Sequence, residues 1–125
     1  MASFEYGGDL TVAYEVSDCG RAIGWYTDVL GFKLLYHLEE MGWCEMETPV
    51  RGVSVGFSQV ESPKVGAGPT LTWAVRDIDA ARAEVEGKGV RFDGETRTIP
   101  GLVRLAVFFD PDGNDLMFSQ SLGKC

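Results

Sequence analysis

The sequence has no long apolar run, no excess of basic charge and no secretion signal. No stretch approaches the roughly 20 apolar residues that cross a bilayer. Residues 1–5 lack the basic region and following apolar stretch of a signal peptide. The formal net charge of −8 would repel the phosphates of nucleic acids. We therefore expect a cytoplasmic protein with neither a membrane nor a nucleic acid as partner.

The chain also has few residues of the kinds that bind metals or act as nucleophiles. Its three cysteines, Cys19, Cys44 and Cys125, share no metal-like spacing and cannot form a complete disulfide framework, so we expect reduced thiols. Cys44 falls in a predicted strand and is a candidate for burial. The only histidine is His37, and neither a phosphate-binding glycine loop nor a nucleophile elbow occurs.

What the sequence does contain is an internal duplication. Phe57-Ser58-Gln59 recurs 61 residues later as Phe118-Ser119-Gln120, and Val16-Ser17-Asp18 is echoed 59 residues later by Val75-Arg76-Asp77. Each Asp precedes a helical pattern, then a glycine, then strand-like segments. One structural unit written twice predicts paired, symmetry-related surfaces. We expect function to lie between them.

Periodicity and capping residues predict the same order of elements in both halves. A period of two predicts a strand from Leu10 to Val16, and Asp18 is a suitable N-cap for a helix that ends at Gly31. In the second half, Asp77 begins a helix and Gly89 stops it. The other strands are expected at 32–38, 43–48, 53–59, 71–76, 102–109 and 115–120, with weaker signals from 90 to 98.

The length of 125 residues suits a single domain, 1–125, because half-units of about 60 residues are marginal alone. We place the first repeat unit at about 8–60 and the second at about 69–121. Between them, residues 60–69 include two prolines and two glycines, a composition typical of a linker.

The clearest local signal is Asp110-Pro111-Asp112-Gly113-Asn114. Pro111 favours the second position of a turn, Gly113 can adopt a positive φ, and the Asp and Asn side chains can bond the local backbone. Strand-like residues flank the segment on both sides, so it predicts a hairpin connection. A calcium loop, the functional alternative, would need more alternating acidic ligands and a Glu at its twelfth position.

The two βαβββ units, this turn and the helix end Trp25-Tyr26-x-x-Val29-Leu30-Gly31-Phe32 together resemble the vicinal oxygen chelate superfamily. That superfamily holds glyoxalase I, extradiol dioxygenases, fosfomycin-resistance enzymes and bleomycin-resistance proteins. The resemblance covers about residues 8 to 121. It implies an α+β fold in which two tandem βαβββ units form a curled, cup-shaped mixed sheet with helices on the outside. By the same analogy we expect a homodimer.

Enzymes of this superfamily hold a divalent metal with His and Glu ligands at four positions on the first and last strands of the two units. On this sequence the positions fall at Thr11, Gly56, Leu71 or Thr70, and Met117. None offers an imidazole or a carboxylate, and His37 lies away from all four. We therefore expect no metal and no other cofactor. An oxygen-only site from scattered carboxylates is the alternative: Glu15, Glu45, Glu47 and Asp115.

Strand alternation predicts which other residues line the cup. The candidate ligand-binding residues are Thr11, Trp43, Glu45, Gly56, Leu71, Trp73, Arg104, Phe108 and Met117. Trp73 is the leading candidate to stack on a planar or cationic ligand, the other interpretation being a core tryptophan under the helix. Arg104 could bind an anionic group of a ligand or pair across strands with Glu45 or Glu47.

These features favour a metal-free, small-molecule-binding protein similar to the bleomycin-resistance branch, which would sequester a planar or cationic ligand in an aromatic cup. One alternative is a glyoxalase-like isomerase, epimerase or lyase that uses a carboxylate base without a metal. Another is a structural or regulatory paralogue whose own side chains fill the cup. Pairing of the two units within one chain and exchange between chains are both compatible with the pattern.

Overall fold

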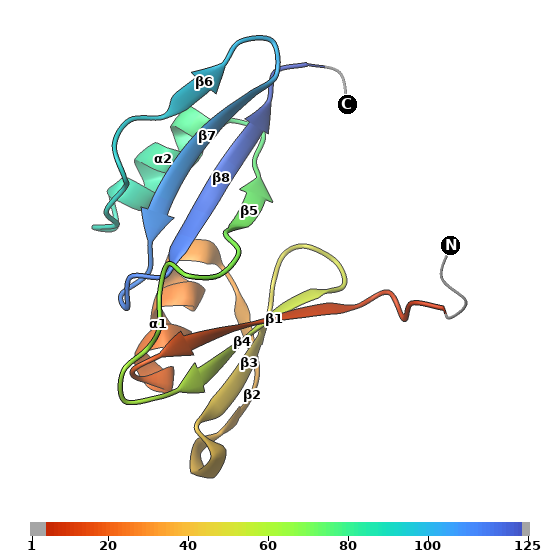
Figure 1. The fold of residues 1–125 in the computed structure, drawn as a ribbon, viewed down its shortest axis with the longest axis vertical. Helices are drawn as coiled ribbons and strands as arrows, with labels where there is room; N and C mark the ends of the chain where they lie inside the picture. Colours follow the sequence, from red (N-terminus) through yellow and green to blue (C-terminus); the bar gives the residue numbers. More distant parts are fainter. Residues whose placement is uncertain (1–4, 124–125) are drawn as a thin grey trace. The chain divides into compact units, whose positions relative to one another are not determined.

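The computed structural model describes residues 5–123, and the chain divides into two compact units, Met1–Pro63 and Lys64–Cys125. Each unit has one four-stranded mixed sheet with a helix against one of its faces (Figure 1). This confirms the α+β class and the duplicated βαβββ arrangement. Cys125, the third predicted free thiol, lies outside the described residues.

The first unit contains one helix and four strands in the predicted order. They are β1 (Leu10–Val16), α1 (Cys19–Leu30), β2 (Lys33–Leu38), the short 3-10 helix η1 (Glu39–Met41), β3 (Trp43–Glu47) and β4 (Val53–Gln59). The spatial order is β1-β4-β3-β2, with β1 parallel to β4 and the other pairs antiparallel. The edge strand β2 contains an irregularity between Leu34 and Tyr36.

The second unit repeats this topology. It contains β5 (Leu71–Ala74), α2 (Ile78–Glu86), β6 (Arg97–Ile99), β7 (Val103–Phe109) and β8 (Asp115–Ser121), in the spatial order β5-β8-β7-β6. Three elements are shorter than predicted. Strand β5 ends at Ala74 rather than at residue 76. Helix α2 ends at Glu86, with Gly87 as its C-cap, rather than continuing to Gly89. The weak strand signal from 90 to 98 becomes β6 and a single bridge from Phe92 to Phe108.

Hydrogen bonds from the repeated segments connect the last strand of each unit to the start of its helix. Asp18 and Asp77 cap the two helices, accepting hydrogen bonds from the backbone N–H groups of Arg21 and Ala80 at 3.0 and 3.1 Å. The terminal glutamines of the tripeptides act at the same helix ends. The amides of Gln59 and Gln120 accept from the backbone N–H groups of Cys19 and Ile78, both at 2.8 Å. The duplicated motif therefore joins the last strand of each unit to the start of its helix.

Each core lies between a helix and the sheet face that it covers. In the first unit, Tyr26 is fully buried, and its ring centroid lies 4.5 Å from that of Phe57. Trp25, predicted as core, remains partly exposed. In the second unit, Phe108 and Phe118 are buried with ring centroids 4.6 Å apart. Because strand residues alternate between faces, these aromatic residues identify the other face of each sheet as the open one.

The Asp110–Asn114 segment is the predicted turn. Asp110 is 5% exposed, and its Oδ1 accepts from the backbone N–H groups of Asp112 and Asn114, both at 2.9 Å. Its Oδ2 accepts from the side-chain amide of Asn114 at 2.9 Å, and Gly113 has a φ of +94°. The Asp110 carboxylate is therefore engaged by donors of its own turn, as a structural rather than a calcium-binding role requires.

Two cysteines of the first unit lie together in its core. Cys19 and Cys44 are both free thiols and fully buried, which confirms the expectation for Cys44. The Cys19 Sγ lies 3.6 Å from the carbonyl oxygen of Phe57, the residue opposite Cys44 in the neighbouring strand. Burial raises the pKa of the Cys44 thiol to about 12, with Cys19 adding to the shift, and burial likewise raises the pKa of Cys19.

These raised pKa values predict alkaline destabilisation. In the unfolded chain both thiols lose their protons near pH 8.5, whereas the folded core keeps them neutral, so this contribution to stability is complete below that pH. The free energy of unfolding should fall as the pH rises from about 9 to 12. Urea unfolding across this range measures the fall, and Cys44→Ala should have the flatter pH dependence even though its stability is lower throughout. Parallel curves for the two proteins would contradict the assignment.

Candidate functional site

The open face of the first sheet carries three cross-strand rows of side chains. Strand pairing aligns them as Lys33, Glu47, Ser54 and Thr11 in row one, Tyr36, Glu45, Gly56 and Ala13 in row two, and Leu38, Trp43, Ser58 and Glu15 in row three. Successive rows are about 7 Å apart, because they are two positions apart along strands β1, β3 and β4 and each residue of a strand advances it by about 3.3 Å. Four sequence-predicted site residues therefore share one face: Thr11, Trp43, Glu45 and Gly56.

A hydrogen-bond network crosses this face with Glu45 at its centre. The hydroxyls of Ser54 and Tyr36 each donate to one oxygen of the Glu45 carboxylate, both at 2.8 Å. The Ser54 hydroxyl also lies 2.9 Å from that of Thr11, and the Trp43 indole N–H donates to the Tyr36 oxygen at 3.2 Å. These bonds fix the orientation of a charged group and of two aromatic rings before any ligand arrives.

The indole of Trp43 lies directly over Gly56. A Cβ built on Gly56 would come within 3.0 Å of three ring carbons of Trp43, closer than real Cβ atoms approach other atoms. Gly56 itself is buried, although it has no side chain. The glycine is therefore required by the tryptophan, whose ring occupies the space that a side chain at position 56 would fill.

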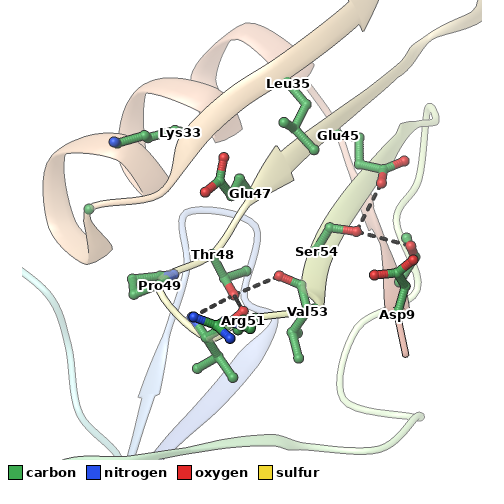
Figure 2. Close-up of a pocket in the computed structure, with 14 residues that line it drawn as sticks. Asp9, Lys33, Leu35, Glu45, Glu47, Thr48, Pro49, Arg51, Val53 and Ser54 are labelled. Atoms are coloured by element: carbon green, nitrogen blue, oxygen red, sulfur yellow. Dashed lines mark hydrogen bonds between the residues drawn. The ribbon is translucent and has the colours of Figure 1, made fainter. Parts of the chain in front are cut away.

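Next to this network is an open pocket of about 810 Å³ (Figure 2). Its walls come from the starts of β1, β2 and β4, the end of β3 and the turn at 48–52. Thr48 holds that turn in place, since its hydroxyl donates to the carbonyl oxygen of Val53 at 2.7 Å. The pocket is lined by both signs of charge: Asp9, Glu45 and Glu47, and Lys33 and Arg51.

The acidity of the chain is concentrated in this unit. Residues 1–63 contain ten acidic and three basic residues, a formal charge of −7, whereas residues 64–125 contain nine acidic and eight basic residues, a charge of −1. The field around the first unit therefore favours cations. The total net charge of −8 does not by itself show that nearly all of the negative charge is in the first unit.

On the second sheet, the open face repeats only part of this arrangement. Thr70, the counterpart of Thr11 at the offset of 59, donates to the carboxylate of Asp115 at 2.7 Å. Met117 lies between the buried Leu116 and Phe118 in sequence and therefore faces the open side, as predicted.

The expected placement of Leu71 and Trp73 on the open face was wrong. The parallel pairing of β5 with β8 sets Leu71 beside Leu116 and Trp73 beside Phe118, and both partners are buried on the helix side. Residues paired in register point to the same face of a sheet. Of the two candidates for the third family position, Thr70 is the one that the register supports, and Trp73 belongs to the helix-side face.

Arg104 and Phe108 are also on the helix side. Phe108 is fully buried beneath α2, so it cannot line the open face. The Arg104 guanidinium forms a two-pronged ion pair with Asp79 of α2, at 2.9 and 3.1 Å, and not with Glu45 or Glu47. The hydrogen bonds from Arg104 hold the pKa of the Asp79 carboxyl below its usual range. The expectation that Arg104 and Phe108 line the open face was thus wrong.

The family's metal does not fit the residues found here. Thr11, Thr70 and Met117 supply no strong ligand, and the space of a ligand side chain at Gly56 is filled by Trp43. His37 pairs with the buried Cys44, which places it on the other side of the sheet from Glu45. Within residues 5–123, no group of three or more His, Cys, Asp or Glu side chains is arranged to hold a metal ion.

Sequence reasoning missed Tyr36, Lys33 and Arg51 as site residues. Tyr36 reaches Glu45 because the irregularity in β2 changes which residues face the open side. Lys33 and Arg51 line the pocket through the start of β2 and the turn before β4.

Helices α1 and α2 have 12 and 9 residues, and no helix of the described part of the chain meets the length and hydropathy of a membrane span.

Comparisons with known proteins agree with this architecture. The model of the Glyoxalase/Bleomycin resistance protein/Dioxygenase superfamily matches residues 10–118. A solved member of that superfamily from Sphaerobacter thermophilus is 24% identical, with a TM-score of 0.79 over 96% of this chain and 100% of its own. TnmS3, described as an antibiotic binding protein from Streptomyces sp. CB03234, is 25% identical, with a TM-score of 0.76 over 97% and 99%.

A glyoxalase/bleomycin resistance protein from the same Streptomyces strain is 27% identical, with a TM-score of 0.70 over 90% of this chain and 99% of its own. A search of curated proteins gave no match. The family model spans most of the chain, and the duplicated fold agrees with it. The chain therefore belongs to the Glyoxalase/Bleomycin resistance protein/Dioxygenase superfamily.

Proposed function

We propose that this protein is a metal-free binder of a planar, cationic small molecule, which it holds on the open face of its first sheet. The observation that carries the proposal is the Glu45 network. A carboxylate oriented by Ser54 and Tyr36, with the Trp43 ring held beside it, combines a fixed negative charge with a flat apolar surface. Carboxylate and ring together suit a ligand whose positive charge is spread over an aromatic system.

Two further observations support this proposal. The first unit carries a formal charge of −7, which would attract a cation over a distance. TnmS3, which is similar in fold and sequence, is described as an antibiotic binding protein. We therefore place the chain with the binding members of its superfamily and extend the proposal to sequestration of a toxic compound in the cytoplasm.

The same observation argues against the enzymatic alternative. A carboxylate base must take a proton from its substrate, and both oxygens of Glu45 already accept hydrogen bonds from hydroxyl groups. These hydrogen bonds fix the orientation of the carboxylate, which suits direct contact with a bound cation. Product formation that continues in EDTA and is lost in Glu45→Gln would instead support a metal-free isomerase, epimerase or lyase.

We further propose that the protein works as a homodimer. Edge strand β2 and the adjacent η1 expose an unusual number of apolar side chains: Leu34 (46%), Leu35 (50%), Tyr36 (42%), Leu38 (43%) and Met41 (75%). An apolar edge strand with unpaired backbone groups is prone to association and is usually covered in a functional protein. Sedimentation equilibrium should give twice the chain mass of 13.6 kDa. A monomer at micromolar concentration would contradict this part of the proposal.

Proflavine, a planar cation without an acidic group, provides the direct test of the binding proposal. It should quench tryptophan fluorescence with saturation, and Glu45→Gln should raise its Kd by about tenfold because one desolvated charge pair is lost. Glu40→Gln is the matched control: Glu40 is exposed in η1 and outside the pocket, so its loss should leave the Kd within about twofold. Equal Kd values for Glu45→Gln and the unmodified protein would remove Glu45 from the site.

A further inference from the structure

The pocket beside Glu45 holds most of the positive charge of the first unit. Only three basic residues occur in residues 1–63, and two of them, Lys33 and Arg51, line this pocket. The third, Arg21, lies in α1 and donates to the Ser17 hydroxyl at 2.8 Å. The first unit has ten acidic residues, and two of its three basic residues are therefore gathered in this one pocket.

The carboxylates that line the pocket do not form ion pairs with these two cations. Among residues 5–123, the side chains of Lys33 and Arg51 form no hydrogen bond or ion pair, although Glu47 is the cross-strand neighbour of Lys33. Figure 2 shows Glu45 and Asp9 on one side of the pocket and Lys33, Arg51 and Glu47 on the other. Asp9 and Glu45 are therefore separated from the two cations, which share their side of the pocket with the single carboxylate of Glu47 and give that side a formal charge of +1.

The order of chemistry along the strands follows from the rows. Row one holds Lys33, the only basic residue of the three rows, beside Glu47. Glu45 follows in row two and Trp43 in row three, at intervals of about 7 Å. The Trp43 ring leans back over Gly56 toward row two, which brings it close to the carboxylate. A pocket of about 810 Å³ is large enough for a drug-sized molecule that spans this distance.

We propose that the ligand is amphoteric: a planar cation that also carries a carboxylate or a similar acidic group, which Lys33 and Arg51 bind while Glu45 and Trp43 hold the cationic ring. This inference rests on the proposed function and specifies its ligand class. A ligand with positive charge alone would meet Lys33 and Arg51 as repulsive groups, whereas an acidic group at that end turns both into attractive contacts.

Rhodamine B and its ethyl ester test this inference because they share the planar cationic ring and differ in one free carboxylate. The unmodified protein should bind rhodamine B three- to tenfold more tightly than the ester, as two exposed charge contacts allow. The double variant with Lys33→Gln and Arg51→Gln should lose that preference, because its binding of rhodamine B should weaken while its binding of the ester should not. Arg21→Gln, which removes the one basic residue of the unit outside the pocket, should keep it.

The outcomes separate the two proposals. Equal binding of both dyes, sensitive to Glu45→Gln but not to the Lys33 and Arg51 substitutions, would overturn the amphoteric ligand and leave the planar cation site intact. A preference for rhodamine B that persists in the double variant would place the anion contact elsewhere and also overturn this inference. Failure of both dyes together with proflavine would overturn the proposed function and this inference with it.

Discussion

Replacing Gly56 with Ala will displace Trp43 from the sheet. The added methyl group would overlap the six-membered ring of the indole, so the ring must move and the hydrogen bond from its N–H to Tyr36 will break. We expect a red shift of the fluorescence emission, greater quenching by acrylamide and a loss of about 1–3 kcal/mol in unfolding free energy. Proflavine binding should weaken at least tenfold because its stacking surface is gone.

Two comparisons show whether the overlap with Trp43 is the cause. In a Trp43→Ala background the space above Gly56 is empty, so Gly56→Ala should then cost little. Gly24→Ala in α1, where an added Cβ meets nothing within 4 Å, should stabilise the protein by up to about 1 kcal/mol. If Gly56→Ala destabilises the Trp43→Ala protein as much as the unmodified one, the indole is not what requires the glycine.

Replacing Asp110 with Ala will be the most destabilising change in the second unit outside its aromatic core. The backbone N–H groups of Asp112 and Asn114 and the Asn114 side-chain amide would all lose their acceptor, and Asn114 is only 3% exposed. Buried donors without partners cost about 1–3 kcal/mol each, and water will reach some of them, so we expect about 3 kcal/mol in total. Thermal or urea unfolding measures the loss.

The control for this change is Asp93→Ala, which removes a carboxylate from an exposed loop of the same unit and should alter stability by less than about 0.5 kcal/mol. Calcium at millimolar concentration should leave the melting temperature of the unmodified protein unchanged, because both Asp110 oxygens accept hydrogen bonds. A calcium-dependent rise that Asp110→Ala abolishes would establish a calcium loop instead of a structural turn.

The sequence allowed most strands and both helix starts to be predicted, because local rules determine them. Alternation in Leu10–Val16 and Val53–Gln59 gave the bounds that the structure has, and Asp18 and Asp77 cap the helices as their positions indicated. Duplication helped, since each unit supported the interpretation of the other. The ends of α2 and β6 were less predictable because Arg82 anchors the intervening loop, with its guanidinium donating to Gly94 and Thr96.

The errors in the site came from the choice of face. Taking Leu71 as the equivalent of Thr11 shifted β5 by one residue, and a shift of one residue exchanges the two faces of a strand. The offset of 59 between Asp18 and Asp77, applied to Thr11, leads to Thr70 and would have avoided the error. The same offset aligns Trp73 with Tyr14. The ring of Tyr14 is nearly parallel to that of the buried Phe57, which is on the helix side of the first sheet.

No sequence signal indicated the contribution of Tyr36. Regular alternation puts Leu34, Tyr36 and Leu38 on one face, but the pairing changes register after Leu34, so Leu34 lies opposite the buried Met46 while Tyr36 lies opposite Glu45. An irregularity of this kind depends on how the whole strand pairs with its neighbour. The polar network around Glu45 was therefore accessible only from the structure.

The glutamine of each tripeptide has a consequence for how such a chain could arise. Gln59 and Gln120 each reach back to a helix of their own half, so a gene of half this length would already encode every partner of these caps. Such a half-length ancestor would be only marginally stable by itself and would gain stability from pairing with a copy of itself. Fusion of two copies through residues 60–69 would then let each half diverge freely. Here the negative charge and the polar network are in the first half, whereas the second half has a formal charge of only −1.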